Sequence, residues 1–370
     1  MPTVDYKDNP LTFPPEALGE RDRQPHLRAA DELLLTAAAA AMTVGVLHDA
    51  HGVIATCLAK SGTQISFVSD RIQHHDRWAR SRVQNELKGA GGEATSVLAP
   101  ADRQPSVNLM TLPKNYGLLR LYLDHIAHAA TADTELAIVF RTKDFSPALL
   151  DIAGEYAADV SQSCAYKKYQ LLHLRGWQRK PFAPTLTEYA FAGLNYRQYP
   201  GVFSRDHVDN ATRFLLEGWG RWPELRDLPE PTTLLDVGCG NGIIADVLGR
   251  VYADAQLHLT DVSAAALASA RINLGERKHT LHWTADLEQL SLRPDLIVTN
   301  PPFHEGRHNT VDIALNLFAA AARLLAPGGH LVVVANRHLG YLPTLERHFV
   351  TVTTVAEDRK YRVYVARKGD

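Results

Sequence analysis

A regular alternation of strand-like and helix-like segments between residues 234 and 336 constrains the fold of this chain more than any other feature. Short apolar runs typical of buried strands alternate there with longer segments of helical period. Strands are expected at 234–238, 257–261, 295–300 and 330–336, and helices at 242–251, 263–275 and 311–325. Such βαβ units predict a parallel sheet. The run FVTVTTVAEDRKYRVYVARK, with its polar turn at Glu357–Asp358, predicts a final antiparallel hairpin.

The N-terminal half repeats this spacing. Segment 44–59 aligns with segment 234–249 so that Gly52 falls on Gly242, and in both halves an acid and then a proline motif follow at similar distances. These three matches in register predict a duplicated α/β domain. The first copy differs at three positions of the loop: Val46, His48 and Ala50 stand in place of Asp236, Gly238 and Gly240. We therefore predict a degenerate domain at 25–160, a basic–aromatic linker at 161–200 and a second, intact domain at 201–370.

The overall composition limits the cellular setting. The chain has 39 basic and 41 acidic residues, and its three cysteines are widely spaced. No apolar stretch approaches the roughly 18 residues of a membrane span, and the N-terminus lacks the apolar core of a secretory signal. Neither a disulfide framework nor a metal-ligand cluster is apparent. We expect a cytoplasmic protein without membrane attachment or bound metal.

Two basic runs stand out against the neutral total. Residues 161–180 and 359–368 each hold five basic residues and no acid, and the first run also contains three large aromatic residues. Basic side chains neutralise phosphates and aromatic rings stack on exposed bases, so both runs suit RNA. Each run equally suits a solvated linker or strand face. The candidate RNA-binding residues are Lys167, Lys168, Arg175, Arg179 and Lys180.

A glycine-rich loop lies between the first strand and helix of the second domain. Its pattern is Gly238-x-Gly240-x-Gly242, whereas a dinucleotide fingerprint would need glycine at position 243, which is Ile243. Three acids accompany the loop: Asp236 before it, and Asp261 and Asp286 after the next two strands. Carboxylates favour a cationic, phosphate-free nucleoside over a pyrophosphate, which predicts S-adenosylmethionine. The alternative is a turn that only tightens helix–strand packing.

The sequence Asn300-Pro301-Pro302-Phe303 follows the strand 295–300, at the edge where open α/β sheets bind ligands. The prolines hold the loop rigid, so the Asn300 side chain and the Pro301 carbonyl can accept both hydrogens of one planar amine, with Phe303 against its ring. This arrangement predicts methyl transfer to an amine conjugated to a ring. His304 either accepts the released proton or faces solvent. A proline pair that merely ends a strand is the simpler alternative.

These motifs resemble those of the bacterial ribosomal RNA guanine-N2 methyltransferases. The similarity covers about 196–368 and includes DVGCGNG, NPPFH, PGVFSRDHVD at 200–209 and VANRHLGY at 334–341; it is looser over 25–195. The resemblance implies two tandem class I (Rossmann-like) methyltransferase domains, of which only the second binds the cofactor. It implies cofactor contacts at Asp236, Gly238, Cys239, Gly240, Asn241, Asp261 and Asp286, with Phe203, Ser204, Arg205 and Asp209 closing over its methionine end. It implies target contacts at Asn300, Pro301, Pro302 and Phe303.

We therefore expect a monomeric enzyme that methylates the N2 amine of a guanine in ribosomal RNA, free or within a ribosomal subunit. The motifs mix small-subunit and large-subunit features, so both 16S and 23S RNA remain open. Two other functions also remain open. One is methylation of an adenine or of a protein glutamine, and the other is a non-enzymatic role as an RNA-binding assembly factor.

Overall fold

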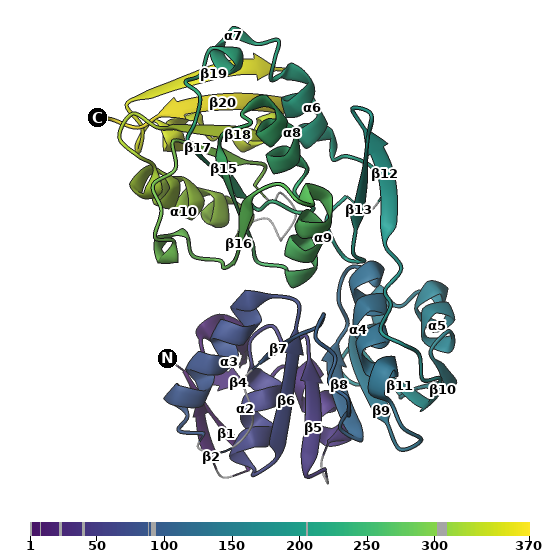
Figure 1. Ribbon diagram of the computed structural model, residues 1–370. Coiled ribbons are helices and arrows are strands. Elements are labelled where there is room, and N and C mark those ends of the chain that lie inside the picture. The colour runs from purple at the N-terminus through teal and green to yellow at the C-terminus, as the bar shows by residue number, and fades with distance from the viewer. Residues whose placement is uncertain are drawn as a thin grey trace. The chain divides into compact units, whose positions relative to one another are not determined.

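The computed structural model describes residues 2–7, 9–21, 24–38, 41–87, 89, 94–204, 206–301 and 309–370. The chain divides into two compact units, Met1–Thr185 and Leu186–Asp370 (Figure 1). Each unit contains one seven-stranded sheet of mixed direction. In the part of the chain described here, no helix is long and apolar enough to cross a membrane.

The second unit has the predicted alternation of strands and helices. Its sheet order is β16-β15-β14-β17-β18-β20-β19, in which the first five strands are parallel and β20 is antiparallel to both of its neighbours, β18 and β19. The strands are β14 (Thr233–Val237), β15 (Gln256–Asp261), β16 (His279–Trp283), β17 (Leu296–Thr299), β18 (His330–Asn336), β19 (Thr351–Glu357) and β20 (Tyr361–Arg367). The helices are α6 (Asn210–Gly218), α7 (Pro223–Arg226), α8 (Ile243–Val251), α9 (Ala264–Leu274), α10 (Asn309–Leu324) and α11 (Leu342–Leu345), with short η3 (Leu287–Gln289) and η4 (Arg337–Leu339).

Both faces of this sheet are buried, which explains why its strands are almost continuously apolar. Along β14, Leu234 packs with residues of α6, α8 and α9 on one face, and Leu235 packs with residues of α10 on the other. Val298 and Ile297 alternate in the same way along β17. Helices on both faces leave only the strand ends open to a ligand.

The first unit has the same sheet plan. Its order, β7-β6-β5-β8-β9-β11-β10, matches that of the second unit strand for strand, including the antiparallel pair at the end. The strands are β5 (Thr43–Leu47), β6 (Gln64–Ser69), β7 (Thr95–Ser96), β8 (Val107–Thr111), β9 (Glu135–Arg141), β10 (Ala157–Gln162) and β11 (Tyr169–Trp177). The helices are α1 (Ala29–Ala37), α2 (Val53–Lys60), α3 (Ile72–Gln84), α4 (Tyr116–Ala129) and α5 (Pro147–Gly154), with η2 (Thr142–Asp144). Before them come β1 (Thr3–Tyr6), β2 (Asn9–Thr12), η1 (Pro15–Ala17), β3 (Gly19–Arg21) and β4 (Gln24–His26).

Segment 161–200 differs from the linker that the sequence predicted. Within it, β11 is paired on both sides, with β9 and with β10. Its apolar residues Leu172 and Leu174 are fully buried, so the strand contributes to the core of the first unit. The hairpin of β12 (Thr187–Phe191) and β13 (Leu194–Gln198) belongs to the second unit. The basic and aromatic residues among the apolar residues of β11 explain why its sequence did not indicate a strand.

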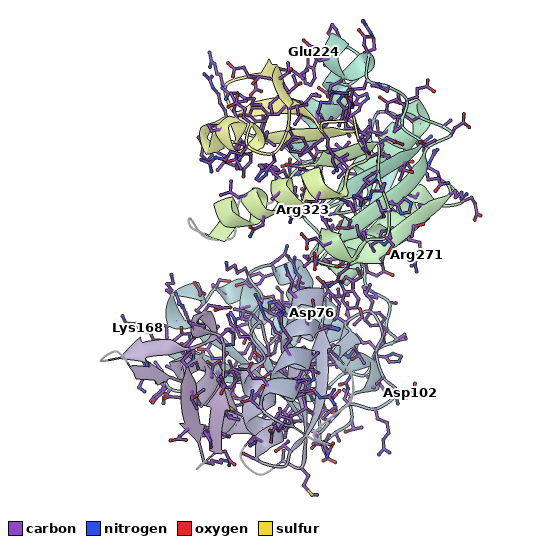
Figure 2. All side chains as sticks on the ribbon, turned by 90° about the vertical axis from the view of Figure 1, so that its left-hand side faces the viewer. Asp76, Asp102, Lys168, Glu224, Arg271 and Arg323 are labelled. Atoms are coloured by element: carbon purple, nitrogen blue, oxygen red, sulfur yellow. The ribbon has the colours of Figure 1, made fainter. Side chains whose placement is uncertain are left out.

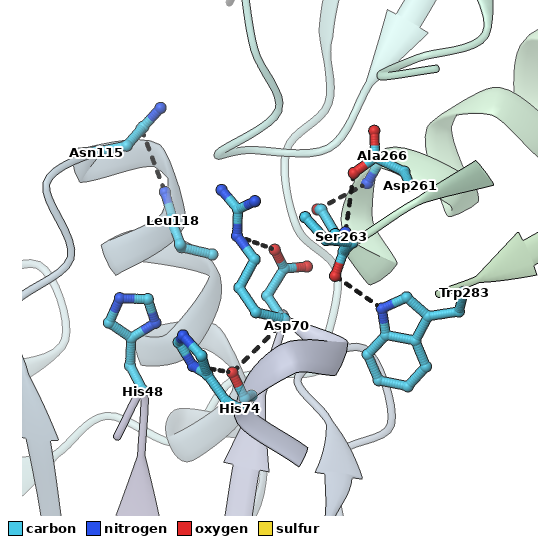
Figure 3. Close-up of polar contacts among 12 residues, drawn as sticks. His48, Asp70, His74, Asn115, Leu118, Asp261, Ser263, Ala266 and Trp283 are labelled. Atoms are coloured by element: carbon cyan, nitrogen blue, oxygen red, sulfur yellow. Dashed lines mark hydrogen bonds and ion pairs between the residues drawn. The ribbon is translucent and has the colours of Figure 1, made fainter. Parts of the chain in front are cut away.

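The loop that would hold a cofactor in the first unit is filled by its own side chains. Asp49 is buried, and its two carboxylate oxygens accept hydrogen bonds from the four N–H groups of Gly52 to Ala55 at the start of α2. His48 bonds the Tyr122 hydroxyl through Nδ1 at 3.2 Å. Its ring also lies against that of His74, with the centroids 5.1 Å apart (both residues are labelled in Figure 3). Because Asp49 already satisfies the N-terminal N–H groups of α2, this helix end offers no free donors to a ligand.

Candidate functional site

The carboxyl ends of four neighbouring parallel strands bring the predicted site residues to one edge of the second sheet. The glycine loop follows β14, Asp261 ends β15, Asp286 follows β16 and Asn300 follows β17. The chain leaves β14 toward β15 on one side, while β17 lies on its other side. In open α/β sheets, the strand ends at such a reversal of strand order are the usual ligand site.

The glycine loop is anchored to the next strand. The Gly238 and Cys239 amides both donate to the Thr260 carbonyl, at 2.9 and 3.0 Å, and the Gly240 amide donates to Asp261 Oδ2 at 2.9 Å. Asp261 Oδ1 accepts from the Ser263 amide at 2.9 Å (Figure 3). The Asp261 carboxylate therefore links the loop after β14 to the start of α9.

Position 242 requires glycine because α8 and α9 pack closely there. A Cβ atom there would lie 2.8 Å from the Cβ of Ala270 on α9, and the residue has φ +79°. By contrast, a Cβ at Gly238 or Gly240 would meet no atom of the described residues within 4 Å. The first and second glycines thus border open space, as a cofactor cradle requires, whereas the third allows α8 to approach α9.

Asp236 carries a buried acceptor without a partner. The residue is fully buried; its Oδ2 accepts from the Ala245 amide at 3.2 Å, while Oδ1 has no hydrogen-bond partner among the described residues. Burial raises the pKa of Asp236 to about 7, and the nearby Asp261 charge adds to the shift. Since a buried polar atom without a partner is costly, this oxygen fits a ligand that carries a donor or a positive charge.

The Asn300 side chain is held in one orientation by the start of α6. Its Nδ2 donates to Asp209 Oδ2 and to Thr212 Oγ1, both at 2.9 Å. Asp209 caps the same helix by accepting from the Ala211 and Thr212 amides. With Nδ2 used in this way, Oδ1 has no hydrogen-bond partner in the described part of the chain. It is therefore the acceptor left for a substrate amine.

Two other residues expected to contact the cofactor form hydrogen bonds within the second unit. Asn241 donates through Nδ2 to the Tyr189 hydroxyl of β12 at 2.7 Å, and its carbonyl accepts from Asn273. Burial raises the pKa of the Cys239 thiol well above its usual value. Asp286 is exposed and caps η3 through the Glu288 amide.

The segment before α6 contains four residues that the family resemblance assigned to the cofactor. Phe203 is 58% exposed, and the Ser204 hydroxyl donates to the His207 carbonyl at 2.6 Å. Asp209 bonds Asn300, which ties this segment to the target-binding motif. Arg205, Pro302, Phe303 and His304 lie outside the described residues, whereas Pro301 is described and buried.

Three site residues escaped the sequence interpretation. Thr212 holds Asn300, Tyr189 holds Asn241, and the Trp283 indole at the end of β16 donates to the Val262 carbonyl at 2.9 Å beside Asp261 (Figure 3). A capping pattern, Asp209 followed by Thr212 at the third position, is a local signal for the first of these. The other two depend on pairing between distant segments.

Four of the five basic residues in the run 161–180 bond acids or backbone carbonyls from elsewhere in the first unit. Lys167 pairs with Glu32 at 3.0 Å and Arg175 with Glu135 at 2.8 Å. Arg179 and Lys180 donate to the carbonyls of His128 and Glu155, respectively. Lys168, with φ +72°, lies in the tight turn between Tyr166 and Tyr169 (Figure 2). Charge counted along the sequence therefore overstates the charge that this surface presents.

Comparisons with known proteins agree with the fold and extend over both units. A family model described as the methyltransferase small domain matches residues 193–365, and a model described as the RLMG N-terminal domain matches residues 14–178. Among curated relatives, the ribosomal RNA large subunit methyltransferase G of Magnetococcus marinus is 31% identical over 331 residues, covering 88% of this chain and 87% of the relative. The protein of the same name from Shewanella amazonensis is 30% identical over 346 residues, covering 87% and 86%.

One solved structure is similar along the whole chain. The T. thermophilus 16S rRNA N2 methyltransferase RsmC, solved in complex with AdoMet and guanosine, has a TM-score of 0.77 and 22% sequence identity. The match covers 99% of this chain and 97% of that structure. It establishes the same two-domain methyltransferase fold.

Proposed function

We propose that this chain, which belongs to the ribosomal RNA large subunit methyltransferase G family, methylates the exocyclic N2 amine of a guanine in large-subunit ribosomal RNA. The enzyme class follows from the family, and the choice of the large subunit follows from the name that these relatives share. The observation that supports amine methylation is the orientation of Asn300, whose Nδ2 is held by Asp209 and whose Oδ1 is left as an acceptor.

The residues at the edge of the sheet fit S-adenosylmethionine. Open space at Gly238 and Gly240, the unpartnered Asp236 Oδ1 and the Asp261 carboxylate suit a cationic nucleoside without phosphate. When bound, this cofactor supplies a methyl group already activated on a sulfonium. We propose that Asp236, Asp261, Asp286 and the glycine loop with Cys239 and Asn241 hold it, and that Phe203, Ser204 and Arg205 cover it.

The chain itself aligns and polarises the target amine. The lone pair of a ring-conjugated amine is delocalised, so the amine is a weak nucleophile. Oδ1 of Asn300 and the Pro301 carbonyl accept its two hydrogens, which orients the nitrogen and stabilises the positive charge that develops on it. Pro302 and Phe303 complete the proposed target site. Asp209 acts through Asn300 and is a positioning residue, because its carboxylate fixes which end of the amide faces the substrate.

Cofactor affinity is expected to fall in acid because of Asp236. Its pKa is raised to about 7 in the free protein, so the residue must lose a proton before it can attract a cation. Binding then releases a proton, and affinity rises with pH until it levels off near pH 7. Below that pH we expect a loss of up to about tenfold per pH unit in cofactor affinity. Calorimetry between pH 5.5 and 8.5 measures this dependence.

The control for that titration is Asp236→Asn, which preserves size and cannot ionise. Its cofactor affinity is expected to be weaker at pH 8 and nearly independent of pH over the same range. An equal pH dependence in both proteins would assign the proton to another group, or to the cofactor's own amino group, and would contradict the role given to Asp236.

RNA is the expected macromolecular partner, and a transfer assay tests it directly. Purified protein, labelled cofactor and separated 23S RNA, 16S RNA, DNA and ribosomal protein are incubated in parallel. We expect label in 23S RNA, and mass spectrometry of the digested RNA should show N2-methylguanosine. Label confined to protein, to 16S RNA or to adenine would refute the proposed substrate. The RNA is assayed both free and as assembled subunits, because either form can present the target base.

A further inference from the structure

A depression of about 430 Å³ on the second unit is lined by basic side chains. Two come from η4 directly after β18, two from the turn between β19 and β20, and one from β20. The lining residues are Arg337, His338, Arg359, Lys360 and Arg362. A concave surface with one sign of charge concentrates the electrostatic potential and attracts counter-ions. No acid is among the residues that line this basic depression.

The basic depression lies at the same sheet edge as Asn300. Strand β18 is parallel to β17, so the residues that follow both strands emerge together. Strand β20 is antiparallel to β18 and begins opposite its end, with Asn336 facing Tyr361. The Arg337 amide donates to the Lys360 carbonyl at 2.8 Å, which joins the two halves of the lining. Only β18 separates β20 from the strand that carries the target-binding motif.

A second connection runs through α6. The helix packs against β18 and β20, and the Phe214 ring lies 6.3 Å from the Tyr361 ring, centroid to centroid. Asp209, which begins this helix, bonds Asn300. The pKa of Lys360 is raised first by the adjacent Tyr361 side chain and further by the Asp209 charge. The basic depression therefore borders the residues that orient the target amine.

The basic depression has excess positive charge. Arg362 bonds Glu357 at 2.6 Å, and Arg337 lies 3.9 Å from the same carboxylate. The Asp358 carboxylate accepts from the backbone amides of Lys360 and Tyr361. In the described ranges, Arg359 and Lys360 form no ion pair with any acid. Four permanent cations against two carboxylates leave a net positive surface at neutral pH.

The corresponding turn of the first unit is different. Strands β10 and β11 occupy the positions that β19 and β20 hold in the second sheet, so the turn with Lys167 and Lys168 corresponds to the turn with Arg359 and Lys360. In the first unit, Glu32 pairs with Lys167. In the second unit, both cations of the turn are available to an external anion.

We propose that the basic depression binds backbone phosphates of the RNA that flank the target guanine. Arginine matches phosphate through its planar fork of donors, and lysine contributes a mobile point charge. The lining begins at the end of β18, the strand next to the one that Asn300 follows. Phosphates bound there would fix the position of the RNA backbone, and so determine which base enters the site. This proposal rests on the proposed function, since it takes RNA to be the substrate.

The test is the double variant Arg359→Glu/Lys360→Glu, with Arg271→Glu/Lys278→Glu as the matched control. The control changes net charge equally at exposed positions on α9 and just before β16 (Arg271 is labelled in Figure 2). Binding of a 23S RNA fragment is measured between 50 and 200 mM salt, together with cofactor affinity. We expect the test variant to bind RNA at least about tenfold more weakly and to lose about 1.5 from the slope of log affinity against log salt. The control should keep the wild-type slope, and both should bind the cofactor normally.

Unchanged RNA affinity in the test variant, or an equal loss in the control, would overturn the proposal. The milder variant Arg359→Gln/Lys360→Gln replaces the first if charge reversal impairs cofactor binding. Displacement of RNA by low millimolar inorganic phosphate, but not by chloride at equal ionic strength, would assign the basic depression to a small anion instead. RNA binding is measured without turnover, so the two proposals can fail separately. If the wild-type protein transfers no methyl group to any RNA, the proposed function is refuted. If the wild-type protein is active but the test variant binds RNA as tightly as wild type, only this inference is refuted.

Discussion

Asn300→Ala is expected to abolish most methyl transfer while leaving cofactor affinity nearly unchanged. The substitution removes the Oδ1 acceptor that has no partner among the described residues, and so removes one of the two groups proposed to stabilise charge on the amine. Loss of one such preorganised group typically lowers kcat by about 100-fold to 1,000-fold. Single-turnover methylation of 23S RNA measures the chemical step, and calorimetry measures cofactor binding.

The fold should tolerate this change. Asp209 still accepts from the Ala211 and Thr212 amides when Asn300 is shortened, so the α6 cap persists. The matched control is Asn195→Ala, at an exposed position of the β13 strand, which should retain wild-type activity. Wild-type turnover in Asn300→Ala would show that the Pro301 carbonyl suffices and that our account of the amine is wrong.

Asp261→Ala is expected to have the second large effect, on cofactor binding. Its carboxylate accepts from the Gly240 amide and from the Ser263 amide, so its removal frees the glycine loop from β15. It also removes a carboxylate that is proposed to hold the cofactor. Losing hydrogen bonds to a charged group, at about 1.5–3 kcal/mol each, should weaken the cofactor by about 100-fold. Calorimetric titration with S-adenosylmethionine measures the change.

Asp254→Ala is the control for this experiment. Asp254 is exposed and lies just before β15, at the end of the strand opposite to Asp261. The substitution removes one negative charge just outside the same strand without touching the loop, and cofactor affinity should stay within about twofold of wild type. A similar loss in both variants would point to general electrostatics, and no loss in Asp261→Ala would remove this residue from the cofactor site.

Local patterns in the sequence were sufficient to predict the architecture of the second unit. The alternation that ends at Asn336 and the hairpin after it appear in the structure nearly as expected, because buried parallel strands and their covering helices differ in period and length. The alignment of Gly52 with Gly242 likewise predicted a duplicated domain, and the two sheets have the same strand order. Asp261 and Asn300 each come at the carboxyl end of a predicted parallel strand. The sequence therefore predicted that both lie at the same edge of the second sheet.

Contacts between distant segments could not be predicted in this way. The sequence indicated an acid-free surface at 161–180, but Glu32 and Glu135 reach it through the fold, because an ion pair needs proximity in space only. The same reason explains why the sequence predicts a linker where β11 lies: the pairing of this strand with β9 depends on residues about 30 positions away.

What the sequence by itself determined is the chemistry available to this protein: a glycine loop with three acids, and an amide followed by two prolines after a strand. Only the tertiary structure decided how those groups are used. It bound the Asn300 amide nitrogen to Asp209, left Asp236 Oδ1 without a partner among the described residues, and brought Arg337 and Lys360 to the lining of one depression. Hydrogen bonds and charges act over a few ångströms, and the sheet brings together at that distance residues separated by tens of positions in the chain.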